Sequence, residues 1–268
     1  MRSFLIVSCL LLVASASAQK LPNVQLTGLR APAKVKADGT LSEWGDLQAY
    51  NKATQVYYTI ANDDNNLYLT IQAKEADIIK KMILGGVSLS INNLGQKSLK
   101  NSVTITYPHY DLVNKPFNAI FTERQEITKD LLKNSSKADS LMILLNKQIS
   151  TRLKMIQIEG VKAIEDSVIS IYNQNGIKVV GLFDNELNYT CELVVPLKYL
   201  SLKKLAKFNY NLKINSTVPK NATITLSGSG NFLSVTVDGS IGSAMAATQQ
   251  NRTLFYSTDF WGEYELVK

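Results

Sequence analysis

The sequence contains little of what metal-based and disulfide-stabilised proteins need. Its 268 residues include two cysteines and one histidine. Cys9 lies in the apolar N-terminal stretch, so Cys191 has no disulfide partner once that stretch is removed. His109 alone cannot supply the two or three imidazoles of a typical zinc site, and no cysteine spacing completes one. We therefore expect neither a disulfide framework nor a zinc centre.

Recognisable catalytic motifs are also absent. The sequence has no G-x-S-x-G nucleophile motif and no glycine-rich phosphate loop after a strand. Its acidic residues are numerous, but no spacing marks two of them as a glycosidase pair. A Cys–His centre is disfavoured because Cys191 alternates with Thr190 and Glu192 as in a strand, where a small core residue fits. We predict that the protein is not an enzyme and has no organic cofactor.

Long apolar runs are missing, and none reaches the roughly 18 residues of a membrane span. Residues 1–18 combine basic Arg2, the apolar run FLIVSCLLLVA and a small-x-small end at Ala16–Ala18, which together are typical of a secretory signal peptide. We predict cleavage after Ala18 and an exported protein, periplasmic or extracellular, without a transmembrane segment.

The excess of positive charge is modest and dispersed. Loss of Arg2 with the signal peptide lowers the formal net charge from +7 to +6, and the lysines are scattered except in residues 201–207, SLKKLAK. A nucleic-acid-binding surface would need a concentrated basic stripe. We therefore expect no nucleic-acid partner.

Alternation of apolar and polar residues dominates the rest of the chain and predicts about ten short strands. The predicted strands are 55–61, 67–73, 87–92, 102–107, 167–173, 177–183, 189–195, 208–214, 222–227 and 232–237. Many short strands separated by turns indicate an all-β protein, with a β-sandwich rather than alternating β–α units. We expect a lead-in over 19–34 and one sandwich domain over 35–268.

Two turns carry strong local signals. The sequence NDDNN at 62–66 predicts a hairpin turn between two strands, and Asn175-Gly176 predicts a type I′ hairpin between 167–173 and 177–183. The alternative for NDDNN is a calcium site, with Asp63 and Asp64 as the candidate ligands.

Two segments have helical periodicity instead. Residues 75–83 form one, and a longer stretch near 122–150 places Leu141, Leu144, Leu145 and Ile149 on one apolar face. That face either packs on the sandwich or docks a protein partner. Residues 239–251, GSIGSAMAATQQN, predict a small polar loop.

Aromatic residues outside the core alternation are the best candidates for binding, because flat rings stack on sugars at little entropic cost. They are Tyr50, Tyr107, Tyr110, Phe117, Tyr256 and Trp261. The sequence YPHYD at 107–111 gathers Tyr107, His109 and Tyr110 around a proline, and its alternative is a turn with half-buried tyrosines.

The segment ADGTLSEWGD, residues 37–46, raises a similar choice for Trp44. Asp38-Gly39 is a turn dipeptide, and Leu41 and Trp44 are spaced to anchor one short turn. We favour a buried Trp44 that begins the sandwich over a Trp44 that stacks on a sugar.

These motifs together resemble family 9 carbohydrate-binding-module-like domains, in particular exported bacterial members of the Bacteroidetes type. The likeness covers most of residues 35–268 and lies in ADGTLSEWGD with VYYTIANDDNNLYLTIQAKE, in FDNELNYTCELVVPLKYL at 183–200, and in the ending STDFWGEYELVK. The resemblance implies a jelly-roll-like antiparallel β-sandwich with helical insertions, sugar binding between aromatic rings, and structural calcium.

Two functions from different classes follow. The first is a secreted, non-catalytic protein that binds a polysaccharide or oligosaccharide, with Tyr107, His109, Tyr110 and Trp261 as its candidate ligand-binding residues. The second is a structural or partner-binding protein of the cell envelope that uses the helical region 122–150 and has no sugar affinity.

Overall fold

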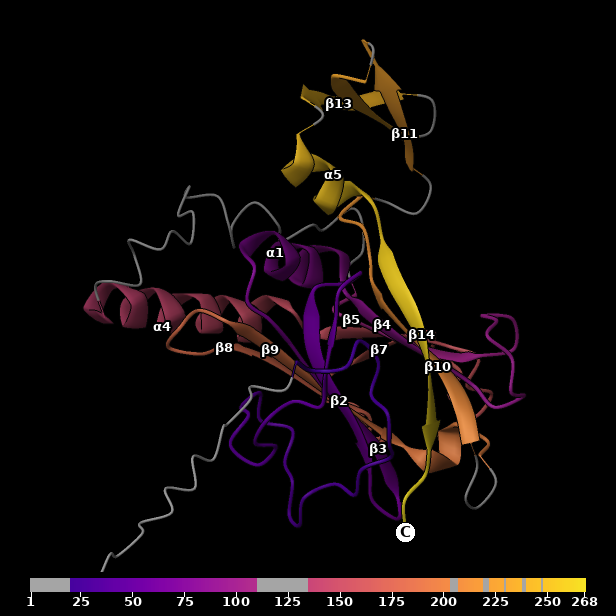
Figure 1. The fold of residues 1–268 in the computed structure, drawn as a ribbon. Helices are drawn as coiled ribbons and strands as arrows, with labels where there is room; N and C mark the ends of the chain where they lie inside the picture. The colour runs from indigo at the N-terminus through magenta and orange to yellow at the C-terminus, as the bar shows by residue number, and fades with distance from the viewer. Residues whose placement is uncertain are drawn as a thin grey trace, which may run out of the picture.

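The computed structural model describes residues 20–109, 135–202, 207–218, 222–228, 230–237, 240–246 and 248–268. In these residues the strands form three antiparallel sheets, accompanied by three α-helices (Figure 1). This is the antiparallel β-sandwich with helical insertions that the alternating sequence predicts. The predicted signal peptide, residues 1–18, lies outside the described residues.

Two large sheets make up the sandwich. The five-stranded sheet has the order β1-β2-β3-β9-β8, with β1 Ala49–Asn51, β2 Val56–Asn62, β3 Asn66–Ala73, β9 Tyr189–Pro196 and β8 Lys178–Phe183. The six-stranded sheet has the order β14-β10-β4-β5-β6-β7, with β14 Thr258–Glu265, β10 Lys207–Ile214, β4 Val87–Asn92, β5 Val103–Tyr107, β6 Met155–Glu159 and β7 Val168–Ser170. A short 3-10 helix, η2 Leu197–Tyr199, follows β9.

The core lies between the inner faces of these two sheets. Tyr58 of β2 and Tyr210 of β10 join the sheets directly, with their hydroxyl oxygens 2.8 Å apart. The ring of Phe260, from β14, packs against both tyrosines. Because side chains alternate along a strand, the same register that buries these rings sends the intervening residues to the outer faces.

The N-terminal lead-in covers the outer face of the five-stranded sheet. The backbone N–H of Ala31 donates to the carbonyl of Asn62, and the N–H of Asn62 donates to the carbonyl of Leu29. A second apolar cluster forms under this segment from Ala31, Trp44, Ala61, Tyr68 and Val194. Trp44 is 9 % exposed, so the alternative of a buried Trp44 that begins the sandwich is confirmed.

Two helices close the sandwich. Helix α1, Ala76–Gly85, matches the predicted segment 75–83 and buries Ile78, Ile79, Met82 and Ile83 in the main core. Helix α4, Ser135–Arg152, packs beside β8, where the Asn146 side chain accepts a hydrogen bond from the Phe183 N–H at 2.7 Å and donates to the Phe183 carbonyl at 2.9 Å. Within the described ranges, no helix is long and apolar enough to cross a membrane.

The apolar face of α4 differs by one residue from the prediction. Leu141, Leu145 and Ile149 are buried in the core, joined by Ala138, while Leu144 is 47 % exposed. Burial follows the i, i+4 row on one side of the helix, and Leu144 lies beside that row. Residues 122–134 of the predicted helical stretch lie outside the described residues.

The predicted hairpin at Asn175-Gly176 is wrong. Strand β7 pairs with β6 in the six-stranded sheet, whereas β8 pairs with β9 in the five-stranded sheet. The turn therefore carries the chain from one layer to the other. Gly176 does adopt a positive φ of 79°, so the glycine is needed, but for a crossing rather than for a hairpin. The NDDNN hairpin is confirmed, since β2 and β3 pair antiparallel around it.

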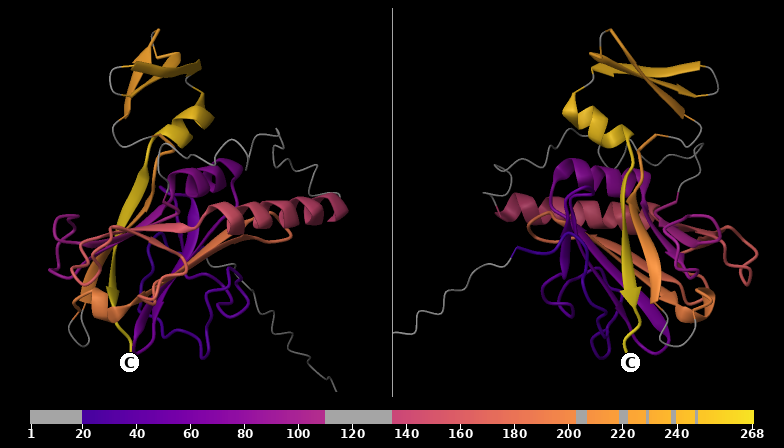
Figure 2. Two further views of the ribbon diagram at one scale, coloured as in Figure 1. Left: turned by 180° about the vertical axis from the view of Figure 1, so that it is seen from behind. Right: turned by 45° about the vertical axis from the view of Figure 1, so that its right-hand side comes forward.

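A third sheet projects from the sandwich (Figures 1 and 2). Its order is β11-β12-β13, with β11 Ala222–Ser227, β12 Phe232–Val237 and β13 Ser240–Ala246, and helix α5, Gln249–Phe255, follows it. Leu233 and Val235 of β12 pack with Phe255 of α5 in a small separate cluster. The loop predicted for 239–251 is therefore incorrect, because most of it forms β13 and the start of α5.

Candidate functional site

Of the cluster predicted at 107–111, the structure describes Tyr107 and His109. Tyr107 ends β5 on its inner side, where the ring is buried and the hydroxyl donates to the Leu153 carbonyl at 3.0 Å. Burial raises the pKa of Tyr107. His109 is half-buried, and its backbone N–H donates to the Met155 carbonyl. Tyr110 lies outside the described residues. The strand register makes Tyr107 a core residue and not a surface ring.

Trp261 occupies a different environment, on the outer face of the six-stranded sheet. Its neighbours in β14, Phe260 and Tyr264, belong to the core, so the alternation turns Trp261 outward. The same reasoning places a set of polar residues on this surface, which we call the outer polar face. Its members are Ser88, Ser90, Thr104, Thr106, Asn209, Asn211, Lys213, Asp259, Trp261 and Glu263.

One cross-strand row of the outer polar face combines an aromatic ring, an amide and two hydroxyls on four neighbouring strands. Its members, paired by register, are Trp261, Asn211, Ser90 and Thr104. Neighbouring strands lie about 4.8 Å apart, so the groups are evenly spaced across the sheet. Ser90 and Asn211 are the buried members of the row, each 2 % exposed. Thr104 and Trp261 are half-buried.

The hydroxyls of this face pair with one another. The oxygens of Ser90 and Thr104 lie 2.8 Å apart, and those of Ser88 and Thr106 lie 2.7 Å apart. Each pair uses one hydroxyl proton as the donor, so the second proton of the pair remains for another acceptor. Ser88 and Ser90 are buried, whereas Thr104 and Thr106 are half-buried, so the threonine hydroxyls are the members of these pairs that a ligand could reach.

The amides of the face also retain hydrogen-bonding capacity. Asn211 donates through Nδ2 to Asp259 Oδ2 at 2.7 Å and to the Phe260 carbonyl at 3.1 Å. Within the described part of the chain, Asn211 Oδ1 accepts no hydrogen bond, and the Asn209 amide makes none. An indole beside two such amides can combine ring stacking with directed polar contacts.

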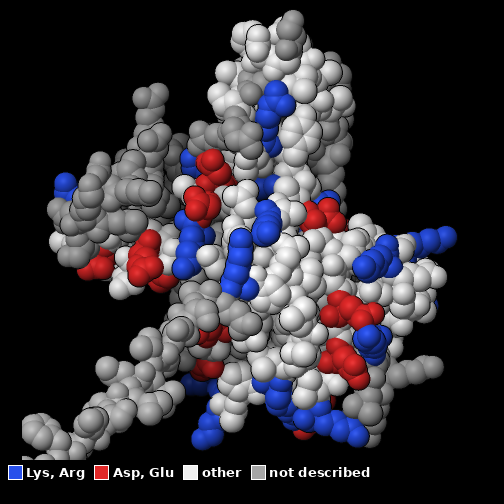
Figure 3. Space-filling view, in the orientation of Figure 1, with Lys and Arg blue, Asp and Glu red and all other residues white. Residues whose placement is uncertain are grey.

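Charge on the face seen in Figure 3 is mixed rather than segregated. In the space-filling view, acidic and basic side chains are interspersed over the visible face (Figure 3). At the lower end of β10 and β14, Lys207 forms an ion pair with Glu263. This distribution favours a neutral or weakly charged ligand over a polyanion.

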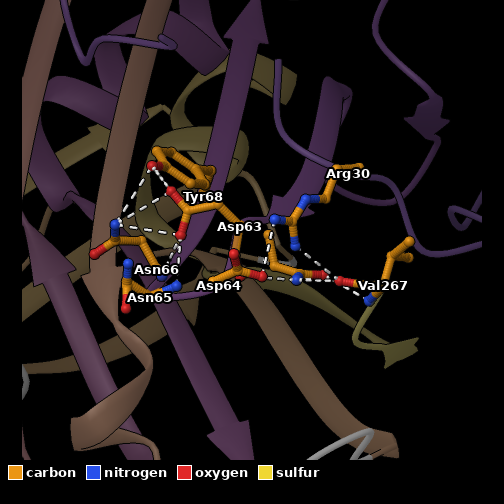
Figure 4. Close-up of polar contacts among 8 residues, drawn as sticks. Arg30, Asp63, Asp64, Asn65, Asn66, Tyr68 and Val267 are labelled. Atoms are coloured by element: carbon orange, nitrogen blue, oxygen red, sulfur yellow. Dashed lines mark hydrogen bonds and ion pairs between the residues drawn. The ribbon is translucent and has the colours of Figure 1, made fainter. Parts of the chain in front are cut away.

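Asp63 and Asp64, the candidate calcium ligands, are both engaged by protein donors (Figure 4). Asp63 Oδ1 accepts the backbone N–H groups of Asn65 and Asn66, each at 2.7 Å, and Oδ2 accepts the Tyr68 hydroxyl at 2.6 Å. Burial acts to raise the pKa of Asp63, but these hydrogen bonds outweigh it and lower the pKa. Asp64 pairs with Arg30 at 2.9 Å.

The contacts of Asp63 and Asp64 are those expected of a hairpin turn, the alternative to a calcium site. The side chain of Asp63 holds the hairpin between β2 and β3, as an aspartate does in an Asx-stabilised turn. In the described residues, no group of three or more His, Cys, Asp or Glu side chains is placed to hold a metal ion.

Glu192 is a buried acid that the sequence did not mark out. It lies in β9 on the outer face of the five-stranded sheet and is 2 % exposed. Its carboxylate accepts hydrogen bonds from the indole N–H of Trp44, from the backbone N–H groups of Asp38 and Gly39, and from the Thr70 hydroxyl. Glu192 therefore anchors the ADGTLSEWGD segment to the sheet.

Cys191 precedes Glu192 in β9 and lies on the opposite face of the five-stranded sheet. It is a free cysteine, buried in the main core, and burial raises the pKa of its thiol. A buried thiol that stays protonated is neither a nucleophile nor a metal ligand, in agreement with the core role expected from the sequence.

The sequence named Trp261 as a candidate binding residue but did not identify the polar residues beside it on the outer polar face. The signal was present in FNYNLKI, where Asn209 and Asn211 alternate with core residues. The two asparagines were unremarkable there because nothing local places β10 beside β14.

Comparison with known proteins gives no family assignment. A scan against models of protein families finds no match to this chain, and a search of curated proteins finds no relative. The fold and the outer polar face define the class: a mostly β protein, built as a sandwich with a polar, aromatic-flanked sheet surface.

Proposed function

We propose that this chain is an exported, non-catalytic carbohydrate-binding protein and that its ligand lies across the outer polar face. The observation that carries the proposal is the row formed by Trp261, Asn211, Ser90 and Thr104. A sugar ring has an apolar face that stacks on an indole and hydroxyls at its edge that need amide and hydroxyl partners. The row offers these two kinds of contact side by side.

The direction of the row suits an extended saccharide. Its members step from strand to strand at about 4.8 Å, a repeat close to the length of one sugar unit in an extended chain. The first unit would stack on Trp261, the next two would lie over Asn211 and Ser90, and the fourth would reach the Thr104 hydroxyl.

The test is binding of the purified protein to a glycan array and to insoluble polysaccharides. Trp261→Ala is expected to weaken retention roughly tenfold, since it removes the stacking surface. Tyr256→Ala is the matched control, because Tyr256 is an aromatic residue, 44 % exposed, that lies outside the face. Unchanged retention by Trp261→Ala would exclude this site, and absence of binding to every glycan would exclude the function.

The expectation of export rests on the sequence of residues 1–18. N-terminal sequencing of protein made by its native host is expected to begin at Gln19. A mature chain that still begins at Met1 would contradict export by this route.

A partner-binding role in the cell envelope is the second candidate, and one observation favours it. Ile143 and Leu144 are consecutive residues of α4 and are 64 % and 47 % exposed. Adjacent exposed apolar side chains are a common feature of docking surfaces. Because other residues of α4 fill the core, deletion of the helix would unfold the protein, so the test is Ile143→Lys with Leu144→Lys. Loss of a co-purifying envelope protein, with glycan binding absent in the wild type, would favour this function.

A further inference from the structure

A second ligand-sized site lies at the turn end of the sandwich, away from the outer polar face. An open depression of about 620 Å³ forms where the β2–β3 turn, the turn before β8 and the end of β9 meet. We call it the turn-end depression. It is lined by Asp64, Asn65, Asn66, Gln174, Asn175, Gly176, Lys178, Pro196, Leu197 and Lys198.

The backbone around the depression is held rigidly. The Leu197 N–H donates to the Asn65 carbonyl at 2.7 Å, which ties the β2–β3 turn to the end of β9. The Tyr199 hydroxyl donates to the Asn175 carbonyl at 3.0 Å, and the Asn175 N–H donates to the side chain of Asn173. A fixed rim loses little conformational entropy when a ligand binds.

The side-chain amides on this fixed rim are free to bind. Within the described residues, the side chains of Asn65, Gln174 and Asn175 make no hydrogen bond, in contrast to Asn66, whose amide contacts Asp63. Each amide supplies two donors and one acceptor oxygen, the pattern that vicinal hydroxyls require.

Two cations complete the lining. Lys178 and Lys198 are exposed, and neither forms an ion pair in the part of the chain that the structure describes. The Lys198 ammonium lies 4.9 Å from the centroid of the Tyr199 ring, which holds it beside the depression. The acid in the lining, Asp64, is engaged by Arg30 through Oδ1, so Oδ2 can accept a hydroxyl.

We propose that the turn-end depression binds an acidic sugar residue, with the sugar carboxylate between Lys178 and Lys198 and the hydroxyls on the three free amides. Two lysines and one aspartate leave the lining with one net positive charge, which suits a singly charged carboxylate. The proposal rests on the carbohydrate-binding function above and gives it a second, charge-selective site. A glycan with acidic branches would then contact the protein at both places.

The experiment compares three disaccharides by NMR titration of the purified protein: one ending in glucuronate, one ending in glucose, and the 6-sulfated form of the latter. The glucuronate form is expected to bind most tightly and to shift the resonances of Asn65 and Asn175. Lys178→Gln combined with Lys198→Gln is expected to weaken it about tenfold, and added salt is expected to do the same. Lys162→Gln is the matched control, an exposed lysine outside the lining.

Each result decides the matter. Equal binding of the glucuronate and glucose forms, or retention of binding by the double lysine variant, would overturn the proposal. Tighter binding of the sulfated form would assign the site to sulfate and overturn the carboxylate. Trp261→Ala separates the two sites: loss of glucose-form binding with glucuronate binding intact supports both, whereas loss of glucuronate binding in that variant overturns the turn-end depression alone.

Discussion

Trp44 and Glu192 are 148 positions apart in the sequence and hydrogen-bonded in the fold. The pair holds the segment 37–46 on the five-stranded sheet, and the ring centroids of Trp44 and Tyr68 lie 6.0 Å apart. The backbone N–H groups of Asp38 and Gly39 and the Thr70 hydroxyl of β3 reach the same carboxylate, so most of the donors that compensate its burial come from residues 37–46.

Trp44→Phe should therefore destabilise the protein. The variant keeps most of the apolar contact but removes the indole N–H, which leaves a buried carboxylate oxygen short of a donor at a cost of about 1–3 kcal/mol. Urea unfolding measures the loss. Trp261→Phe is the control: it changes a half-buried indole with no intramolecular hydrogen bond in the described residues and should cost less than about 1 kcal/mol. Equal losses in the two variants would contradict the role assigned to Trp44.

Glu192 also makes a pH-dependent contribution to stability. Burial raises the pKa of Glu192 above its ordinary value of 4.5, although the hydrogen bonds from Gly39, Trp44 and Asp38 act in the opposite direction. The folded state thus binds this proton more tightly than the unfolded state. The contribution of Glu192 to the free energy of unfolding should therefore fall as pH rises from about 4.5 through the raised pKa.

The comparison of wild type with Glu192→Gln isolates this effect. The glutamine resembles the protonated acid and does not titrate, so the stability advantage of the wild type should be largest at low pH and decline as pH rises. Urea midpoints measured at a series of pH values test it. An advantage that grows with pH would mean that the hydrogen bonds outweigh burial.

At the scale of the element, helix α4 shows how one apolar pattern divides between core and surface. Leu145 is 4 % exposed, while its neighbour Leu144 is 47 % exposed. Leu145→Ala is expected to cost about 2–5 kcal/mol by leaving a cavity, and Leu144→Ala less than about 1 kcal/mol. Thermal unfolding of the two variants is the measurement. Similar losses of stability in the two variants would show that the Leu144 side chain is also buried.

Most of the strands were predictable from the sequence, and their faces with them. Alternation identified the core strands correctly because one buried face imposes a period of two. Alternation did not identify β1, β6 and β14 as strands, and β13 fell within a predicted loop; β1 has three residues, too few to show a period. The Asn175-Gly176 signal misled for a related reason: a local turn preference cannot tell whether the next strand pairs in the same sheet or in the other.

At the scale of the whole molecule, the projecting sheet β11–β13 is set apart from the sandwich (Figure 2). Its own cluster consists of few residues, chiefly Leu233, Val235 and Phe255, and the contact between α5 and α1 links it to the body. Since the cluster is this small among the side chains that the structure describes, the unit should open more readily than the main core.

Hydrogen exchange can measure this difference. Amides of β11–β13 are expected to exchange at lower protection than those of β3 and β9, and Phe255→Ala should lower their protection further while leaving β3 and β9 unchanged. Equal protection in both regions, or a loss in all strands on Phe255→Ala, would show that the molecule opens as one unit.

The sequence by itself determined the class of fold, the NDDNN turn and the buried position of Trp44. The strand alternation, the NDDNN turn and the spacing of Leu41 and Trp44 each lie within a few residues of the chain, where alternation and turn chemistry act directly. The tertiary structure alone decided which strands share a sheet. The pairing places Tyr107 in the core, Asn211 of β10 beside Trp261 of β14, and two distant turns around one depression. Pairing between remote segments depends on how both sheets pack over the whole core, so the local sequence cannot decide it.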